Sequence, residues 1–221
     1  MKTRILNLMA AAAVALTMVS CGAGGFGTLA MDSEDAVNKV KDLVTSNVDP
    51  DEWKIIQIDW NEGTSNDATL GNNLYQGSIF MKLVKSDGKV FSQGFTGQLG
   101  FKATPIEPDF WYDQGLDYEK ITPIDMSKFD PTTIVKQIEE AKKMIPAEYE
   151  FKSLAEYSMK AGIPQSRDGK GEYTAESTSE FTINVVEKGN ETVSNAGTTS
   201  IIYYEIDFNV APDGTITMEL E

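Results

Sequence analysis

The sequence contains no histidine, and Cys21 is its single cysteine among 221 residues. Without histidine, the chain cannot build a serine–histidine–aspartate or cysteine–histidine nucleophile system, or a histidine-ligated zinc, copper or iron site. One cysteine also excludes a disulfide within the chain. Catalysis would have to rely on carboxylates, lysine, tyrosine or serine, and no motif supports such a role. We therefore predict no catalytic residue, no metal site and no cofactor, which favours a protein that is not an enzyme.

Basic residues are scarce as well. Nineteen lysines and arginines stand against 34 aspartates and glutamates, a net charge of −15, and arginine occurs only at Arg4 and Arg167. Because nucleic-acid recognition depends on clustered lysine and arginine, we expect no nucleic-acid partner. The same shortage disfavours adhesion to anionic lipid through a basic patch. A hydrophobic content of 41% nevertheless predicts a folded core.

The first twenty residues have the layout of a secretory signal peptide. Lys2 and Arg4 form a basic start, an apolar run covers residues 5–19, and small residues flank Cys21. The run is shorter than the roughly 20 residues that a membrane-spanning helix needs. A membrane anchor or a buried helix is the alternative interpretation. We predict a signal peptide over residues 1–20, cut before Cys21.

Residues 18–21, Met-Val-Ser-Cys, resemble the lipobox of bacterial lipoproteins, in which an apolar residue stands three positions before the cysteine and a small residue directly before it. The resemblance implies that Cys21 receives a diacylglyceryl group and that its new amine is acylated after cleavage. Several acyl chains, at ~0.8 kcal/mol per buried methylene, anchor a protein durably. Residues 21–31 would then form a Gly-rich tether. The expected location is the cell envelope, on the outer membrane facing the periplasm if the cell has two membranes.

Two amphipathic helices are expected. Apolar residues at helical spacing predict the first from a cap at Asp32 or Ser33 to about residue 46. The second opens with Asp130 as the cap and Pro131 in the first turn. An Asp-Gly pair between apolar runs predicts a β-hairpin over 74–101. Further strands are predicted over 53–60, 118–124, 149–160, 180–187, 199–210 and 215–220.

Helix, strand, loop and hairpin occur twice in this order, at an offset of about 100 residues. The order predicts an α+β fold of two tandem helix-plus-antiparallel-meander units, 32–104 and 131–221, packed together. A connection rich in proline and aromatic residues, 105–130, would join them. The order of elements is similar to the α-β4 units of β-lactamase-inhibitor-like and PepSY-like secreted domains. The alternative is an α+β fold with two helices and meanders but no repeat.

The connection holds the most distinctive surface candidate, Phe110, Trp111 and Tyr112, between Asp109 and Asp113. Exposed aromatic rings beside carboxylates could bind a sugar or a peptide. The preferred interpretation is that the three rings plug the junction between the two units, since large aromatics usually bury area. For the whole chain we expect a lipid-anchored envelope domain that binds a protein or peptide partner. The alternative is a carbohydrate-binding module or a carboxylate-based glycan hydrolase.

Overall fold

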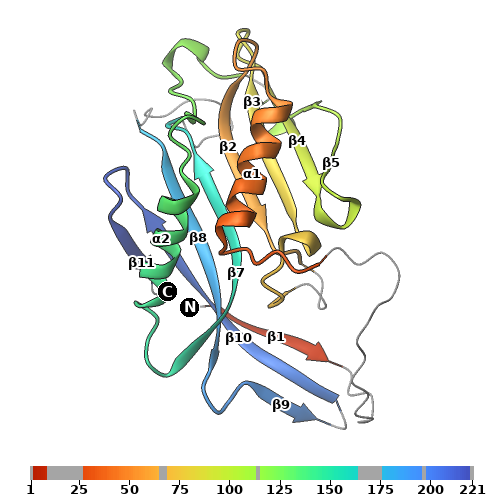
Figure 1. Ribbon diagram of the computed structural model, residues 1–221, viewed down its shortest axis with the longest axis vertical. Coiled ribbons are helices and arrows are strands. Elements are labelled where there is room, and N and C mark those ends of the chain that lie inside the picture. The colour runs from red at the N-terminus through yellow and green to blue at the C-terminus, as the bar shows by residue number, and fades with distance from the viewer. Residues whose placement is uncertain are drawn as a thin grey trace.

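The computed structural model describes residues 2–8, 27–64, 69–112, 115–163, 176–195 and 198–219 (Figure 1). Within these ranges all strands join one antiparallel sheet in the order β1-β10-β8-β7-β2-β3-β4-β5, with β9 and β11 also pairing β10, and β6 pairing β4. The strands are β1 (Lys2–Leu8), β2 (Lys54–Asn61), β3 (Ser78–Val84), β4 (Val90–Thr96), β5 (Lys102–Ala103), β6 (Glu107–Pro108), β7 (Tyr149–Lys160), β8 (Thr178–Glu187), β9 (Thr192–Asn195), β10 (Thr198–Val210) and β11 (Ile216–Glu219). Helices α1 (Glu34–Asn47) and α2 (Pro131–Lys142) lie on one face of this curled sheet.

The predicted pair of tandem helix-plus-meander units is wrong. β2 and β7, the first strands after each helix, pair with each other through Ile58↔Met159 and Trp60↔Tyr157. This pairing fuses the two meanders into one sheet with one main apolar core, which takes residues from both predicted units. The periodicity of apolar residues predicts each helix and strand and the face that it buries. The buried faces are the same whether β2 and β7 pair with each other or stay apart, so the periodicity could not predict this pairing.

A row of stacked aromatic rings runs through that core. Trp60 stacks on Tyr157 at 4.5 Å between ring centroids, Tyr157 on Phe181 at 5.4 Å, and Phe181 on Phe208 at 5.2 Å. The four residues face one another across β2, β7, β8 and β10, so each strand contributes one ring. Aromatic pairs of this kind add about 0.5–1.5 kcal/mol each beyond the area that they bury.

Both helices begin where the sequence predicts. The Ser33 hydroxyl accepts the Ala36 backbone N–H at 3.2 Å, and the Asp130 carboxylate accepts that of Thr132 at 3.2 Å, as expected of helix caps. The apolar stripes, Val37, Val40 and Val44 on α1 and Ile134, Ile138 and Ala141 on α2, are buried against the sheet.

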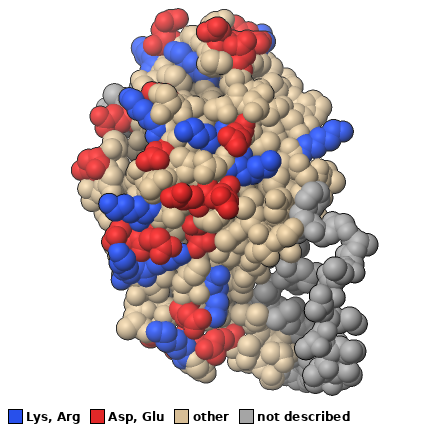
Figure 2. Space-filling view, viewed as in Figure 1, with Lys and Arg blue, Asp and Glu red and all other residues tan. Residues whose placement is uncertain are grey.

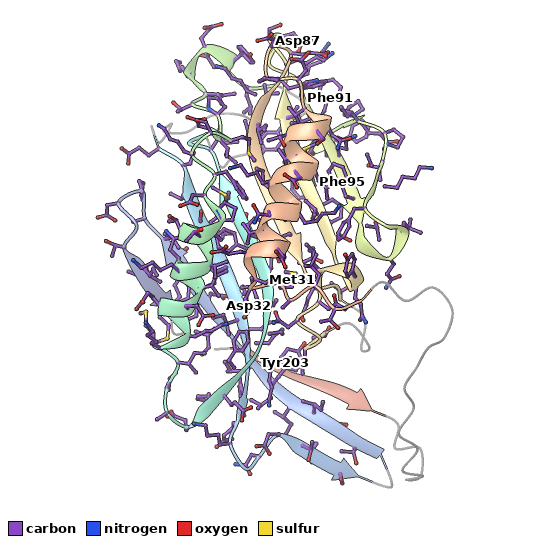
Figure 3. The ribbon with its side chains drawn as sticks, viewed as in Figure 1. Met31, Asp32, Asp87, Phe91, Phe95 and Tyr203 are labelled. Carbon is purple, nitrogen blue, oxygen red and sulfur yellow. The ribbon has the colours of Figure 1, made fainter. Side chains whose placement is uncertain are left out.

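The start of α1 is tied to the end of α2. Lys142 forms an ion pair with Asp32, which precedes α1, and its ammonium lies 4.3 Å from the centre of the Phe151 ring. Burial opposes ionisation of Asp32, but hydrogen bonds from Lys142 and Asn72 outweigh it and hold the pKa of Asp32 below its ordinary value. Figure 3 places Asp32 and the buried Met31 beside this junction. Of the expected tether, residues 29–31 pack on the domain.

The predicted hairpin is confirmed as β3 and β4. Its turn requires glycine, because Gly88 has a φ of +78° and an added Cβ would lie 2.2 Å from the Leu116 carbonyl oxygen. The Leu116 backbone N–H in turn donates to the Gly88 carbonyl at 2.8 Å, which fastens the long connection to the hairpin. The predicted edge strand over 118–124 is not formed: Tyr118–Lys120 is one 3-10 turn, and Thr122 makes an isolated antiparallel bridge with Gly162. β5, just before the connection, and β6, within it, pair with β4.

The two faces of the sheet differ in charge pattern. On the side that carries the helices, Figure 2 shows lysines interspersed with acids. On β2, β7, β8 and β10 the residues that alternate with the core are mostly polar. Five acids on these strands and one on β11 form what we call the acidic face: Asp59, Glu156, Glu180, Glu205, Asp207 and Glu219. Neither helix covers this face.

Candidate functional site

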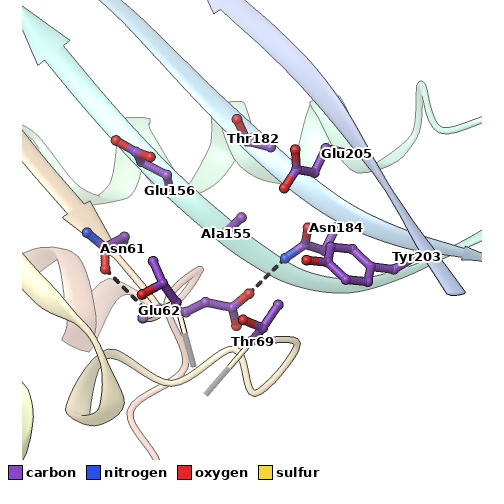
Figure 4. Close-up of a pocket in the computed structure, with 11 residues that line it drawn as sticks. Asn61, Glu62, Thr69, Ala155, Glu156, Thr182, Asn184, Tyr203 and Glu205 are labelled. Atoms are coloured by element: carbon purple, nitrogen blue, oxygen red, sulfur yellow. Dashed lines mark hydrogen bonds between the residues drawn. The ribbon is translucent and has the colours of Figure 1, made fainter. Parts of the chain in front are cut away.

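The acidic face is hollowed into a pocket of about 280 Å³ beside the segment that follows β2 (Figure 4). β7 contributes Ala155 and Glu156, β8 contributes Thr182 and Asn184, and β10 contributes Tyr203 and Glu205. Figure 4 shows Glu156, Thr182 and Glu205 side by side on one side of the three strands, with Glu62 below them. The pocket therefore gathers side chains that lie far apart in the sequence.

Glu62 forms the base of the pocket and is almost completely buried, with 1% of its surface exposed. Its carboxylate accepts four hydrogen bonds: from the Ser153 hydroxyl at 2.6 Å, the Asn184 amide at 2.8 Å, and the backbone N–H groups of Leu70 at 3.1 Å and Asn72 at 2.7 Å. Burial raises the pKa of Glu62, and these donors act against the increase. With its acceptor positions filled, Glu62 is a positioning residue.

The two backbone donors to Glu62 belong to strained residues. Leu70 has a φ of 67° and Asn72 a φ of 45°, a left-handed conformation that costs a non-glycine residue about 1–3 kcal/mol. A buried acceptor that binds both N–H groups offsets this cost and holds the segment against the sheet. Leu70 then packs against Val186, Ile201 and Tyr203, a small apolar cluster separate from the main core. Glu62 therefore holds the segment that forms this wall of the pocket in place.

Asn184 leaves one strong acceptor unused in the pocket wall. Its amide nitrogen donates to Glu62 and, at 3.0 Å, to Ser153, whereas its carbonyl oxygen is buried and accepts no hydrogen bond from the part of the chain that is described. The side chain is 1% exposed. An unsatisfied buried polar atom costs about 1–3 kcal/mol, so a ligand that donates a hydrogen bond here would recover free energy.

Glu156 is the carboxylate of the pocket whose charge is least compensated by hydrogen bonds from described residues. Desolvation raises its pKa, and the neighbouring carboxylates Asp59, Glu180 and Asp207 raise it further, while Lys160 has the opposite effect. No hydrogen bond or ion pair joins the Glu156 carboxylate to another described residue. Glu156 therefore lies in a field of negative charge that a cationic or hydrogen-bond-donating ligand would relieve.

Its neighbours on the acidic face are already engaged. Asp59 accepts hydrogen bonds from Ser158 at 2.5 Å and Gln57 at 2.7 Å, and Asp207 accepts one from Thr182 at 2.6 Å. Glu180 pairs with Lys160. Burial raises the pKa of Asp59 despite its two donors. These partners hold the acids in place around Glu156 without neutralising the face as a whole.

The aromatic triplet of the connection lies elsewhere and does not line the pocket. Phe110 and Trp111 are 77% and 68% exposed, so the interpretation of the triplet as a plug is wrong for these two rings. Tyr112 is half-buried and packs on the core, with the Lys82 ammonium 5.2 Å from its ring centre. The short turn Phe110–Tyr112 follows Asp109, which forms an ion pair with Lys82 at 3.5 Å, so it is fastened over β3. A binding role for Phe110 and Trp111 stays a prediction.

A second hollow, of about 690 Å³, lies between the end of α1 and residues 118–128. Its walls include Val44, Val48, Trp53 and Met126, and the Lys54 ammonium at its edge donates to the Tyr118 and Ile121 carbonyls at 2.7 and 3.0 Å. The hollow is larger but mainly apolar. Among the described side chains that line it, none has a carboxylate or amide oxygen that lacks a hydrogen-bond partner, as those of Glu156 and Asn184 do. The smaller pocket is therefore the better candidate.

Cys21 lies outside the described residues, and its predicted acylation stays a prediction. Among the residues that are described, no helix is long and apolar enough to cross a membrane, and no group of three or more acids or cysteines could hold a metal ion. Comparison of the chain with protein-family models, with curated proteins and with solved structures finds no match. The functional argument therefore depends on the geometry of the pocket.

Proposed function

We propose that this chain is a lipid-anchored cell-envelope domain that binds a protein or peptide partner through basic side chains of that partner. The binding surface would be the acidic face, with the pocket at Glu156 and Asn184 as its centre. The observation that carries the proposal concerns Glu156 and Asn184, which line the same pocket. The carboxylate of Glu156 and the buried carbonyl oxygen of Asn184 have no hydrogen-bond partner among the described residues. Both groups accept hydrogen bonds, so the matching ligand is a donor.

Charge supports the same choice of partner. A protonated lysine or arginine donates several hydrogen bonds and carries the charge that the acidic face lacks. Charge-assisted hydrogen bonds are roughly twice as strong as neutral ones. The net charge of −15 adds long-range attraction for a basic partner, which speeds its association at low salt.

Binding accounts for the pocket better than hydrolysis. Glycoside hydrolysis requires two carboxylates with separate roles, a proton donor and a nucleophile or base. Glu62 already accepts four hydrogen bonds and holds the pocket wall, and Glu205 has interactions of its own, so neither is free to act as a second catalytic carboxylate beside Glu156. The exposed rings of Phe110 and Trp111 favour carbohydrate binding as the second candidate function, at a separate surface.

The test of anchoring uses the native chain and its Cys21→Ser variant. We expect the native protein to incorporate labelled fatty acid and to remain with membranes after a high-salt wash. The variant should lose the label and keep the leader, as the mass of the isolated protein would report. A native chain without acyl label would contradict the lipid anchor. It would not contradict the binding site, which the next experiment tests.

The test of binding uses short peptides of equal length that differ in charge. Lysine- and arginine-containing peptides should bind the native protein, with an affinity that falls as salt increases. Glu156→Gln should weaken this binding about tenfold. The matched control is Glu140→Gln on α2, which removes an exposed acid from the other side of the molecule and should leave binding unchanged. Equal losses in both variants would contradict the site.

A further inference from the structure

β10 has a partner strand on each side, and these partners change along its length. On one side, residues from Tyr204 onward pair with β8, and residues before it pair with β9. On the other side, Asp207–Val210 pair with β11, whereas Thr199–Glu205 pair with β1. β1 is the start of the chain and falls within the predicted signal peptide. Removal of the leader would leave the backbone of Thr199–Glu205 without a strand on that side.

We propose that this edge of β10, Thr199–Glu205, is a strand-acceptor site for an extended, basic segment of a partner protein. The leader strand β1 would occupy the edge before cleavage, and the partner segment would occupy it in the mature protein. The inference rests on the proposed function, because the edge is vacated only if the leader is removed. Addition of a peptide strand to a free sheet edge is a common mode of peptide recognition, with affinity from main-chain hydrogen bonds and specificity from alternate side chains.

The composition of the edge favours an occupant. Residues 201–204 are Ile-Ile-Tyr-Tyr, and the edge contains neither proline nor lysine. β-branched and aromatic residues on an unpaired edge, without a lysine or a proline to block further pairing, make it prone to aggregate. The described part of β11 does not protect this part, since it pairs only with Asp207–Val210. A partner strand would satisfy the backbone and cover the edge.

The register of β1 shows which positions of an added strand lie opposite the pocket residues of β10. Lys2 stands opposite Glu205 and Arg4 opposite Tyr203. Glu205 and Tyr203 both line the pocket on the acidic face, and Figure 3 shows Tyr203 where β1 meets β10. Since directly opposite residues of an antiparallel pair share a face of the sheet, a segment with basic residues at alternate positions would carry them on the pocket side. The occupant that the charge pattern fits is therefore a strand with the sequence basic, any residue, basic.

A second copy of the chain fits the edge less well. Two copies paired through β10 would join two chains of net charge −15 and place their acidic faces next to each other. Like charges brought together across an interface cost several kcal/mol. Charge complementarity therefore favours a basic segment, and self-association becomes an outcome for the experiment to detect.

The experiment compares the mature lipoprotein, isolated from membranes in mild detergent, with the uncleaved Cys21→Ser chain. The probe is a labelled peptide with the sequence of residues 2–8, Lys-Thr-Arg-Ile-Leu-Asn-Leu. The control peptide replaces its lysine and arginine with glutamate. We expect the basic peptide to bind the mature protein at least about tenfold more tightly than the control peptide, and more tightly than it binds the uncleaved chain. Glu205→Gln should reduce this preference for the basic peptide.

Hydrogen exchange distinguishes edge pairing from adhesion to the acidic face. The Ile202 backbone N–H donates to the Glu191 carbonyl at 2.9 Å, toward β9, and the Ala211 N–H donates to the Thr215 carbonyl, toward β11. Because backbone groups alternate sides along a strand, the N–H groups of residues 201, 203 and 205 point to the vacated edge. The peptide should therefore protect these three amides and leave 202 and 204 unchanged. Tyr203→Pro, which removes one such donor, should weaken binding.

Several results would overturn the inference. Equal binding of both peptides would do so, as would protection of amides 202 and 204 to the same degree as 201, 203 and 205. A dimer of the mature protein that the peptide does not displace would assign the edge to a second copy. The mass of the isolated protein is an independent readout. A retained leader would overturn the proposed processing, whereas alternate-amide protection in a chain cut at an introduced protease site after Cys21 would still support the edge.

Discussion

Asn184 and Glu62 are 122 positions apart in the sequence, yet the Asn184 amide donates a hydrogen bond of 2.8 Å to the Glu62 carboxylate inside the molecule. The bond joins β8 to the segment after β2 and orients the Asn184 carbonyl oxygen without giving it a partner among the described residues. The geometry of the pocket and the stability of the fold therefore depend on the same carboxylate.

Loss of Glu62 should be strongly destabilising. Glu62→Ala would leave the donors of Ser153, Asn184, Leu70 and Asn72 unsatisfied and would no longer offset the left-handed backbone of the last two. We expect the free energy of unfolding to fall by about 3 kcal/mol, measured by urea denaturation. Glu52→Ala is the control, because it removes a half-exposed acid that pairs with Lys85, a change expected to cost under ~1 kcal/mol. Similar losses in both variants would contradict the role of Glu62.

Replacement of Glu156 should have the opposite effect on stability. Its pKa is raised in the folded state, so the unfolded chain releases the proton first, and the folded state loses stability as the pH rises above the ordinary value of 4.5. Glu156→Gln should therefore raise Tm at about pH 7 and leave it unchanged at about pH 3.5, where the carboxyl group is protonated in both states. A lower Tm at neutral pH would show that Glu156 is a structural residue.

The Asp32–Lys142 ion pair should contribute stability over a defined pH range. The pKa of Asp32 is lowered, so its contribution is present above 3.8 and is lost as the pH falls through its folded-state pKa. Burial disfavours the charge on Lys142, but the hydrogen bonds that its ammonium donates to Asp32 and Glu139 raise its pKa, so its contribution disappears only as the pH rises above 10.5. Asp32→Asn should cost about 1–3 kcal/mol near neutral pH. A double-mutant cycle with Lys142→Met should give a coupling energy that vanishes in acid; additive losses would contradict the pair.

The exposed aromatic residues allow a test of the alternative function. Trp111→Ala and Phe110→Ala should change the free energy of unfolding by less than about 0.5 kcal/mol, because both rings are exposed. Tyr112→Ala should cost more, since its ring packs on the core and on Lys82. A glycan array then separates the hypotheses. Glycan binding that Trp111→Ala abolishes at unchanged Tm would establish a carbohydrate site, and an array without any binding would remove that alternative.

Local signals in the sequence predicted most elements correctly. Ser33, Asp130 and Pro131 mark the helix starts, and Gly88 marks the hairpin, because caps and tight turns are settled by a few neighbouring residues. The pairing of β2 with β7 left no such signal. Each strand has an apolar and a polar face, and nothing in that alternation indicates which edge it meets. The expected two units became one sheet for this reason.

The same limit applies to the candidate site. The alternation of β7 places Glu156 on the polar side, so its outward position could be predicted from the sequence. Its role could not, since the carboxylates that raise its pKa come from three other strands. Glu62 and Asn184 gave no local signal at all, because their significance comes from contacts between residues far apart in the sequence. Cys21 is the one proposed functional residue that is predicted from a local motif.

The aromatic row from Trp60 to Phe208 has a consequence for the time course of folding. Its last ring belongs to a strand near the end of the chain, so a ribosome must release almost the whole protein before the core can close. Proteins with such long-range pairing fold in milliseconds to seconds, slowly compared with helical bundles. If the leader directs secretion as proposed, this delay keeps the chain open while a secretion channel threads it.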